Sequence, residues 1–139
     1  MSGRALRWAV VLLDLDSVEG HEQAGLRPVL VVSYEPFYNL GLLTVVPITS
    51  ARTEPRLPGD VPVPAGEAAL ARLGGIVCSQ IRTVSVLRIR NQGPGRVRYV
   101  TSPTIRAQVR EALGHHLALD LRPELDNAEG GGMFVVADG

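Results

Sequence analysis

The residues best placed to do chemistry lie where a polar, glycine-bracketed loop (residues 20–27) meets a continuous apolar segment (residues 28–33). Pro28 fixes its own φ and pushes Arg27 towards extended geometry, so Arg27 is held at the mouth of a strand. A cation mounted in this way can point at an anion from a rigid base. The alternative is that Arg27 is a surface residue at the start of a buried strand and has no function. One arginine alone does not define a functional site.

Charge is distributed unevenly along the 139 residues. The chain has 14 acidic and 14 basic residues, and every basic residue is arginine. Residues 68–110 hold eight arginines and no acid, whereas residues 111–139 hold one arginine and six acids. This asymmetry is expected of an anion-binding surface. A coding bias would explain arginine in place of lysine, but not a stretch of 43 residues without Asp or Glu.

Four of these arginines lie in two alternating segments, residues 87–90 and 96–100, separated by a glycine-rich and proline-containing loop. The pattern predicts a β-hairpin. If the apolar residues of both segments face inward, one outer face carries Arg88, Arg90, Arg96 and Arg98. Four like charges on one face are tolerable if solvated and useful if they meet phosphates or carboxylates. Both interpretations stay open.

The elements that must position these residues are mostly strands. Apolar runs predict strands over residues 8–14, 28–33, 42–48 and 75–84, and prolines confine residues 60–64 to a sheet edge. Ser102 as N-cap and Pro103 at the first position predict one helix. Its apolar stripe comprises Ile105, Val109, Ala112, Leu113 and Leu117. Successive strands followed by a helix predict an α+β fold dominated by an antiparallel sheet or barrel over residues 1–122. Residues 123–139 are expected to form an acidic, glycine-rich tail.

Other chemistries have little support in the sequence. Cys78 is the only cysteine and lies in a strand-like run, which favours a packed, inert thiol over a nucleophile. His115 and His116 are adjacent late in the helix, so they point about 100° apart and suit the helix C-terminus better than a metal. No phosphate-binding glycine motif, paired metal-ligand spacing or membrane-length apolar run is present. We therefore expect a cytoplasmic protein without metal, cofactor or membrane contact.

Five segments and the helix form a pattern when they are taken in order. The most specific is GHEQAGLRPVLVVS, residues 20–33. Residues 11–16 precede it, and residues 37–39, 45–50 and 79–84 follow it, before the helix that starts after Ser102. Together these segments resemble the MazF/PemK family of toxin ribonucleases, and the resemblance covers about residues 7–120.

The resemblance implies a small SH3-like barrel, usually a homodimer, that acts as the toxin of a type II toxin–antitoxin system. Such proteins cut single-stranded RNA or mRNA at short sequences without metal. They leave a 2′,3′-cyclic phosphate and a 5′-hydroxyl, and a cognate MazE-like antitoxin neutralises them. By position, Arg27 and Thr49 would be the catalytic pair. Because arginine stays protonated at neutral pH, we expect Arg27 to stabilise the phosphorane and Thr49 to donate a hydrogen bond to it.

The general base stays open. His21 could titrate near neutral pH, but the family often has serine there, so loop polarity competes with a basic role. Glu22 could orient Arg27 through an ion pair, and Gln23 and Ser50 are further supporting candidates. For RNA binding, Gln80 could read a base edge and Arg82 could contact a phosphate, beside the four arginines of the predicted hairpin.

Two other functions compete with RNA cleavage. One is a toxin on the same barrel that poisons DNA gyrase, as the related CcdB proteins do, although the presence of both Arg27 and Thr49 argues against it. The other is a nucleic-acid or partner-binding module that does not cleave. The chain also departs from the family pattern. Ser17 stands where the family usually has proline, Leu73-Gly74 stands where it usually has Asp-Ser, and the stretch between Gln80 and Ser102 is several residues longer. We expect these differences to affect the substrate sequence, the dimer contacts and the fit of the antitoxin.

Overall fold

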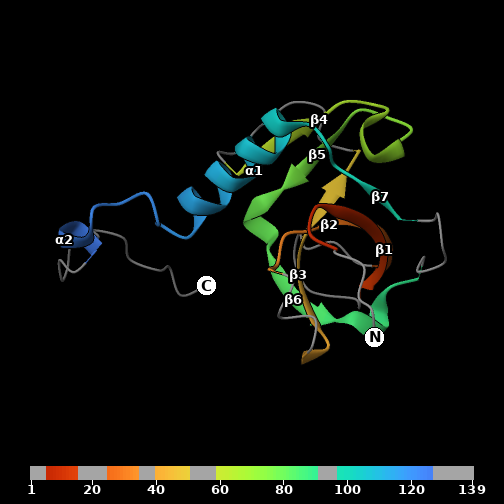
Figure 1. Cartoon of the computed structure of the whole chain (residues 1–139), viewed down its shortest axis with the longest axis horizontal. Coiled ribbons are helices and arrows are strands. Elements are labelled where there is room, and N and C mark those ends of the chain that lie inside the picture. The colour runs from red at the N-terminus through yellow and green to blue at the C-terminus, as the bar shows by residue number, and fades with distance from the viewer. Residues whose placement is uncertain (1–5, 16–24, 35–39, 51–58, 91–96, 127–139) are drawn as a thin grey trace, which may run out of the picture.

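The computed structural model describes residues 6–15, 25–34, 40–50, 59–90 and 97–126 (Figure 1). Its strands are β1 (Ala9–Leu15), β2 (Gly25–Val31), β3 (Leu42–Thr49), β4 (Asp60–Val63), β5 (Gly74–Val77), β6 (Arg82–Ser85) and β7 (Arg98–Tyr99). Short 3₁₀ helices are η2 (Glu67–Ala69), η3 (Cys78–Gln80) and η4 (Val86–Arg88). The chain continues through α1 (Pro103–His116) to α2 (Pro123–Asp126).

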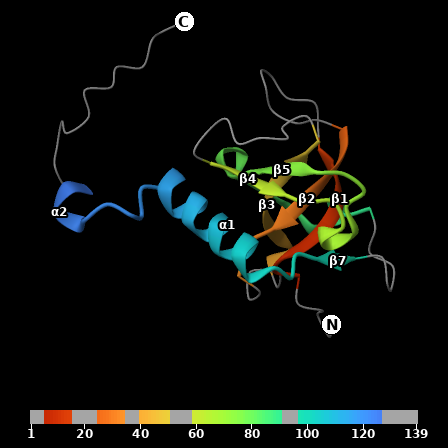
Figure 2. The ribbon, with the colours of Figure 1, turned by 90° about the horizontal axis from the view of Figure 1, so that it is seen from above.

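The strands form one curled antiparallel sheet, in the order β4-β5-β3-β2-β1-β7, with β6 also paired to β3 (Figures 1 and 2). Strand β4 lies at an edge, as the prolines of residues 60–64 predicted. Helix α1 packs beside β4 and η3, while α2 lies away from the sheet in both views. The predicted α+β fold, a small antiparallel barrel with a C-terminal helix, is confirmed in this curled form.

Both faces of the sheet are buried. Leu30 and Val46 belong to a cluster that includes Ile105 and Val109 of α1. Their strand neighbours Val29, Val31 and Val45 belong to a second cluster on the opposite face. Because successive strand residues point to opposite faces, strands buried on both sides must be apolar throughout. This explains why residues 28–32 and 45–48 are apolar throughout.

Helix α1 begins where the sequence predicted. The Ser102 Oγ accepts a hydrogen bond from the Ile105 amide at 3.2 Å, with Pro103 as the first helical residue. Of the predicted stripe, Leu117 is misplaced: it is exposed, because the helix ends at His116 and Ala118 turns the chain through a left-handed backbone conformation, φ 59°. In the part of the chain that the structure describes, no helix is long and apolar enough to cross a membrane.

The predicted strand over residues 75–84 is wrong, because η3 divides it into β5 and β6. Strand β5 pairs Ile76 with Ile48, and an unbroken strand would then place Arg82 opposite Leu42. The structure instead pairs Arg82 with Val45. The turn of η3 therefore takes up three residues, and the Cys78 amide donates to the Gly59 carbonyl at 2.9 Å, which extends the β4–β5 pairing by one residue. As a result, Arg82 lies three residues closer to Thr49 along β3.

The predicted arginine hairpin is also wrong in the residues that the structure describes. Residues 86–88 form η4, Ile89 bridges to Leu13, and β7 pairs with Ala9 and Val10. The two segments thus follow the same outer edge of β1 rather than pairing with each other. The physical reason is that β1 offers a free edge opposite β2, and both segments bury one apolar side chain there, Ile89 and Val97.

Candidate functional site

Arg27 of β2 and Thr49 of β3 line the same cleft. Strand β2 pairs with β3 as far as Val29 and Pro47, and each of the two residues lies two positions beyond that pair on its own strand. On the other edge of β2, Arg27 pairs with Leu13 of β1. Arg27 is exposed and Thr49 is half-buried. The sheet therefore brings together the two side chains that the resemblance singled out, although 21 positions separate them in sequence.

A cleft of about 410 Å³ has both side chains in its wall. Ser50, a predicted supporting residue, lines the same cleft. Pro28, Ile48 and Leu70 add apolar surface. A guanidinium carries five N–H donors and a threonine hydroxyl one, so this wall can donate several hydrogen bonds to a single anion.

The cleft also contains Arg72, which the sequence analysis did not single out. Arg72 precedes β5, where Gly75 pairs with Thr49. A Cβ at Gly74 would lie 3.1 Å from the Thr49 carbonyl oxygen, so the missing side chain lets this segment approach β3 closely. The only sequence signal for Arg72 was its place in the acid-free stretch of residues 68–110. That stretch contains eight arginines, and the sequence does not distinguish Arg72 from the other seven.

Gln80 and Arg82 do not line this cleft in the described structure. Both are half-buried, Gln80 at the end of η3 and Arg82 at the start of β6. Arg82 pairs with Val45, four residues from Thr49 along β3, which corresponds to about 13 Å. Because paired residues share a face, Arg82 lies on the side of the sheet that also carries Thr49. A role in RNA binding stays a prediction for both residues.

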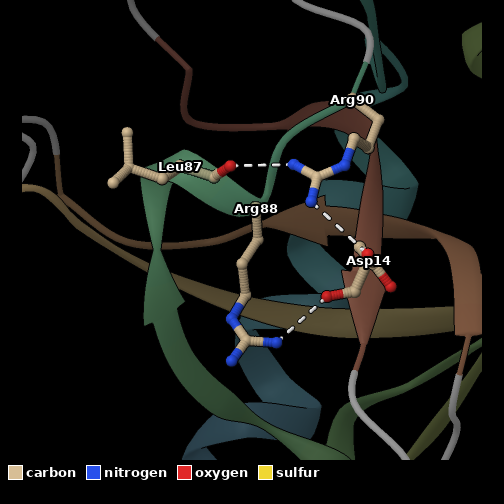
Figure 3. Close-up of polar contacts among 4 residues, drawn as sticks. All are labelled: Asp14, Leu87, Arg88 and Arg90. Atoms are coloured by element: carbon tan, nitrogen blue, oxygen red, sulfur yellow. Dashed lines mark hydrogen bonds and ion pairs between the residues drawn. The ribbon is translucent and has the colours of Figure 1, made fainter.

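Arg88 and Arg90 gather around Asp14 at the end of β1 (Figure 3). The Arg88 Nη1 donates to the Asp14 carbonyl oxygen at 3.1 Å, and the Arg90 Nη2 lies 3.4 Å from the Asp14 carboxylate. Arg90 also donates to the Leu87 carbonyl at 2.8 Å. These arginines therefore fix the chain to β1, and their proposed contact with RNA stays a prediction.

The other two arginines of the predicted hairpin, Arg96 and Arg98, are not placed beside Asp14 by the structure. Arg98 is exposed on β7 and pairs with Val10. Val10 is four residues from Asp14, or about 13 Å along β1. The expected single face of four arginines is thus divided between two ends of β1. Arg96 lies outside the described residues, as do His21, Glu22 and Gln23, so the structure does not place these four.

The titratable groups away from the cleft have other roles. Burial raises the pKa of the Cys78 thiol to about 12, and the charge of Asp60 adds to the shift. A buried thiol that stays protonated is a poor nucleophile, as the sequence predicted. The His115 Nδ1 lies 3.1 Å from the Asp120 carboxylate beyond the end of α1. Among the described residues, no group of three or more His, Cys, Asp or Glu side chains could hold a metal ion.

Several known proteins resemble this chain in sequence and in structure. The Escherichia coli K12 protein "Endoribonuclease toxin ChpB" is 35% identical over 82 residues, which cover 58% of this chain and 69% of that protein. The Mycobacterium tuberculosis toxin MazF-mt6 superposes with a TM-score of 0.61 at 26% identity, covering 81% of this chain and 98% of that one. A MazE–MazF structure from Deinococcus radiodurans gives 0.60 at 27% identity, covering 81% and 95%.

A family model described as PemK-like, MazF-like toxin of type II toxin–antitoxin system matches residues 6–117. These residues comprise most of the chain and include β1 to β7, α1 and the cleft that contains Arg27 and Thr49. The chain therefore belongs to the PemK-like, MazF-like toxins of type II toxin–antitoxin systems.

Proposed function

We propose that this toxin is an endoribonuclease that cuts single-stranded RNA by attack of a ribose 2′-hydroxyl on the adjacent phosphate. The supporting observation is that Arg27 and Thr49, far apart in sequence, line one cleft on neighbouring strands. Relatives named as endoribonucleases, such as ChpB, support the same activity. The products would be a 2′,3′-cyclic phosphate and a 5′-hydroxyl end.

The cleft supplies what this reaction needs most, which is stabilisation of negative charge. As the 2′-oxygen bonds to phosphorus, the equatorial oxygens of the phosphorane gain charge before the bond to the 5′-oxygen breaks. Arg27 donates two parallel hydrogen bonds to those oxygens, and the Thr49 hydroxyl donates one. Such preorganised donors bind the transition state more strongly than the bound substrate. They therefore increase the rate of cleavage rather than the affinity for RNA.

Two protons must also move in this scheme. One leaves the 2′-hydroxyl for a general base, and one reaches the departing 5′-oxygen. Arginine stays protonated at neutral pH, so Arg27 suits proton donation or charge stabilisation better than the role of base. His21, which lies outside the described residues, remains the proposed candidate for the base, and Glu22, also outside them, is proposed to orient Arg27.

We also propose the partners that the family membership suggests. The Deinococcus radiodurans structure pairs a MazF protein with MazE, and a cognate MazE-like antitoxin is the proposed inhibitor of this chain. A homodimer is the proposed assembly. Because the proposed substrate is mRNA, the proposed site of action is the cytoplasm.

The test is cleavage of mixed-sequence RNA by the purified protein in the presence of EDTA, with the 5′ ends of the products mapped. We expect cleavage that survives EDTA, products with cyclic phosphate ends, and no cleavage where the ribose at the mapped site is replaced by 2′-deoxyribose. Arg27→Ala should reduce the rate about 10²-fold or more while the protein stays folded.

The matched control is Arg110→Ala, which removes the same charge from an exposed position on α1 outside the cleft. It should cut RNA like the wild type. A folded wild-type protein that cuts no RNA of any sequence, or an Arg27→Ala variant as active as Arg110→Ala, would reject the proposed function. A gyrase supercoiling assay on the same protein tests the competing class of toxin.

A further inference from the structure

We infer that Arg72 binds the phosphate next to the one that is cut, so that the cleft holds two successive phosphates of the RNA. This inference rests on the proposed function and adds a substrate-binding residue to it.

The geometry places Arg72 across the cleft from the β2 wall. Arg27 enters from β2, whereas Arg72 enters from the segment between η2 and β5. Thr49 lies between these segments along the sheet, because β3 pairs with β2 on one edge and places Thr49 opposite Gly75 of β5 on the other. The close approach at Gly74 fixes the Arg72 segment against Thr49. The two guanidiniums therefore approach a bound RNA from separate walls.

The charge of the cleft suits a polyanion. Among the described residues that line it are two arginines and no acid. Two guanidiniums that line one cleft give it a positive potential, which attracts a polyanion such as RNA. The contrast is the cleft of about 570 Å³ between α1 and β4, whose wall includes Asp60, Glu111 and Asp120. Of these two clefts, the one with Arg27 and Arg72 is the one that fits phosphates.

The size of the cleft favours two phosphates over one. Its volume of about 410 Å³ is in the range of pockets that hold molecules much larger than a single phosphate. Pro28, Ile48 and Leu70 provide apolar surface on which the sugar or base between the phosphates can pack. Because Arg27 and Thr49 bind the reacting phosphate in the proposed mechanism, Arg72 is available to bind the adjacent phosphate.

The test uses an oligonucleotide that carries the mapped cut site, with ribose at the cut position and deoxyribose elsewhere. Each phosphate that flanks the cut is replaced in turn by an uncharged methylphosphonate. On the unmodified substrate, Arg72→Ala should lower kcat/KM about tenfold, mainly through KM, and Arg110→Ala should lower it less than about twofold. On one of the two methylphosphonate substrates, the tenfold penalty of Arg72→Ala should disappear, because the charge that Arg72 binds is already gone.

Arg72→Lys should recover part of the loss, since it keeps the charge but not the planar donor arrangement. An equal penalty for Arg72→Ala on all three substrates, or no penalty on any of them, would overturn the inference while wild-type cleavage still supports the proposed function. Absence of wild-type cleavage would count against the proposed function instead. Binding of the fully deoxy oligonucleotide to wild type and Arg72→Ala then decides separately whether Arg72 contacts the strand.

Discussion

Thr49 and Arg27 contribute different kinds of donor to the same cleft. The arginine brings a full charge and a planar pair of N–H groups, whereas the threonine brings one neutral hydroxyl from a half-buried strand position. The strand holds the hydroxyl rigidly, because Thr49 itself pairs with Gly75 of β5. A rigid donor needs no reorganisation during the reaction, so even a single neutral hydrogen bond can have a large effect on rate.

Thr49→Val replaces the hydroxyl with a methyl group of similar size. We expect kcat to fall about 10²-fold to 10³-fold with little change in KM. The control is Thr83→Val on β6, where the hydroxyl bonds the Thr44 hydroxyl at 2.9 Å and lies outside the cleft. Steady-state kinetics of both variants, with urea unfolding to compare their stability, check this. Equal rates for Thr49→Val and Thr83→Val would remove Thr49 from the reaction.

At the scale of elements, β1 joins the cleft to the arginine-rich segment that follows β6. Leu13 pairs with Arg27 on one edge of β1 and with Ile89 on the other. Next to it, Asp14 receives hydrogen bonds from Arg88 and Arg90. The Asp14–Arg90 ion pair is about half exposed on both sides, so it contributes no more than about 1 kcal/mol to stability. The pair also neutralises one charge among the arginines that the sequence predicts to bind RNA.

Asp14→Ala therefore tests whether Arg90 binds RNA, whereas Arg88 donates to the Asp14 main-chain oxygen, which alanine keeps. If Arg90 binds RNA, removal of the carboxylate should raise the affinity for an uncleavable deoxy oligonucleotide about two- to five-fold at low salt and steepen its salt dependence. Asp120→Ala, which removes a carboxylate paired with His115 beyond the end of α1, should leave the affinity unchanged. Fluorescence anisotropy titrations measure both variants. Equal or weaker binding by Asp14→Ala would assign Arg90 a structural role only.

At the scale of the whole molecule, opposite charges are separated along the chain. The sheet side holds the cleft with Arg27 and Arg72, and the side of α1 holds the cleft with Asp60 and Glu111. Residues 123–139 add four acids and no arginine. The first four of these residues form α2, and residues 127–139 lie outside the described structure. We propose that residues 123–139 are a separate acidic tail that competes with RNA for the arginines.

Deletion of residues 123–139 would change the formal net charge from zero to +4. We expect the affinity for RNA to rise several-fold at low salt, and the difference to vanish near 1 M salt, where charges are screened within about 3 Å. The control keeps the length of the tail and replaces its four acids by their amides. It should bind RNA as tightly as the deletion variant. Unchanged affinity after deletion would show that the tail does not compete.

The sequence by itself determined most of the strands, the start of the helix and the candidate pair Arg27 and Thr49. Apolar runs and the Ser102 cap depend on local chemistry, and the structure bears out the strands around residues 28–33 and 42–48 and the start of α1. Arg27 and Thr49 were singled out because several segments, taken together in order, resemble the family.

Only the tertiary structure decided what depends on contacts between distant segments. Alternation in residues 87–100 fits a hairpin as well as two segments on one strand edge, and the free edge of β1 selected the second. The η3 turn shifted Arg82 by three residues along β3, which the apolar pattern of residues 75–84 does not reveal. Arg72 became part of the cleft only through the close approach at Gly74. A local pattern sets which face a side chain takes, but the partner strand sets what lies opposite it.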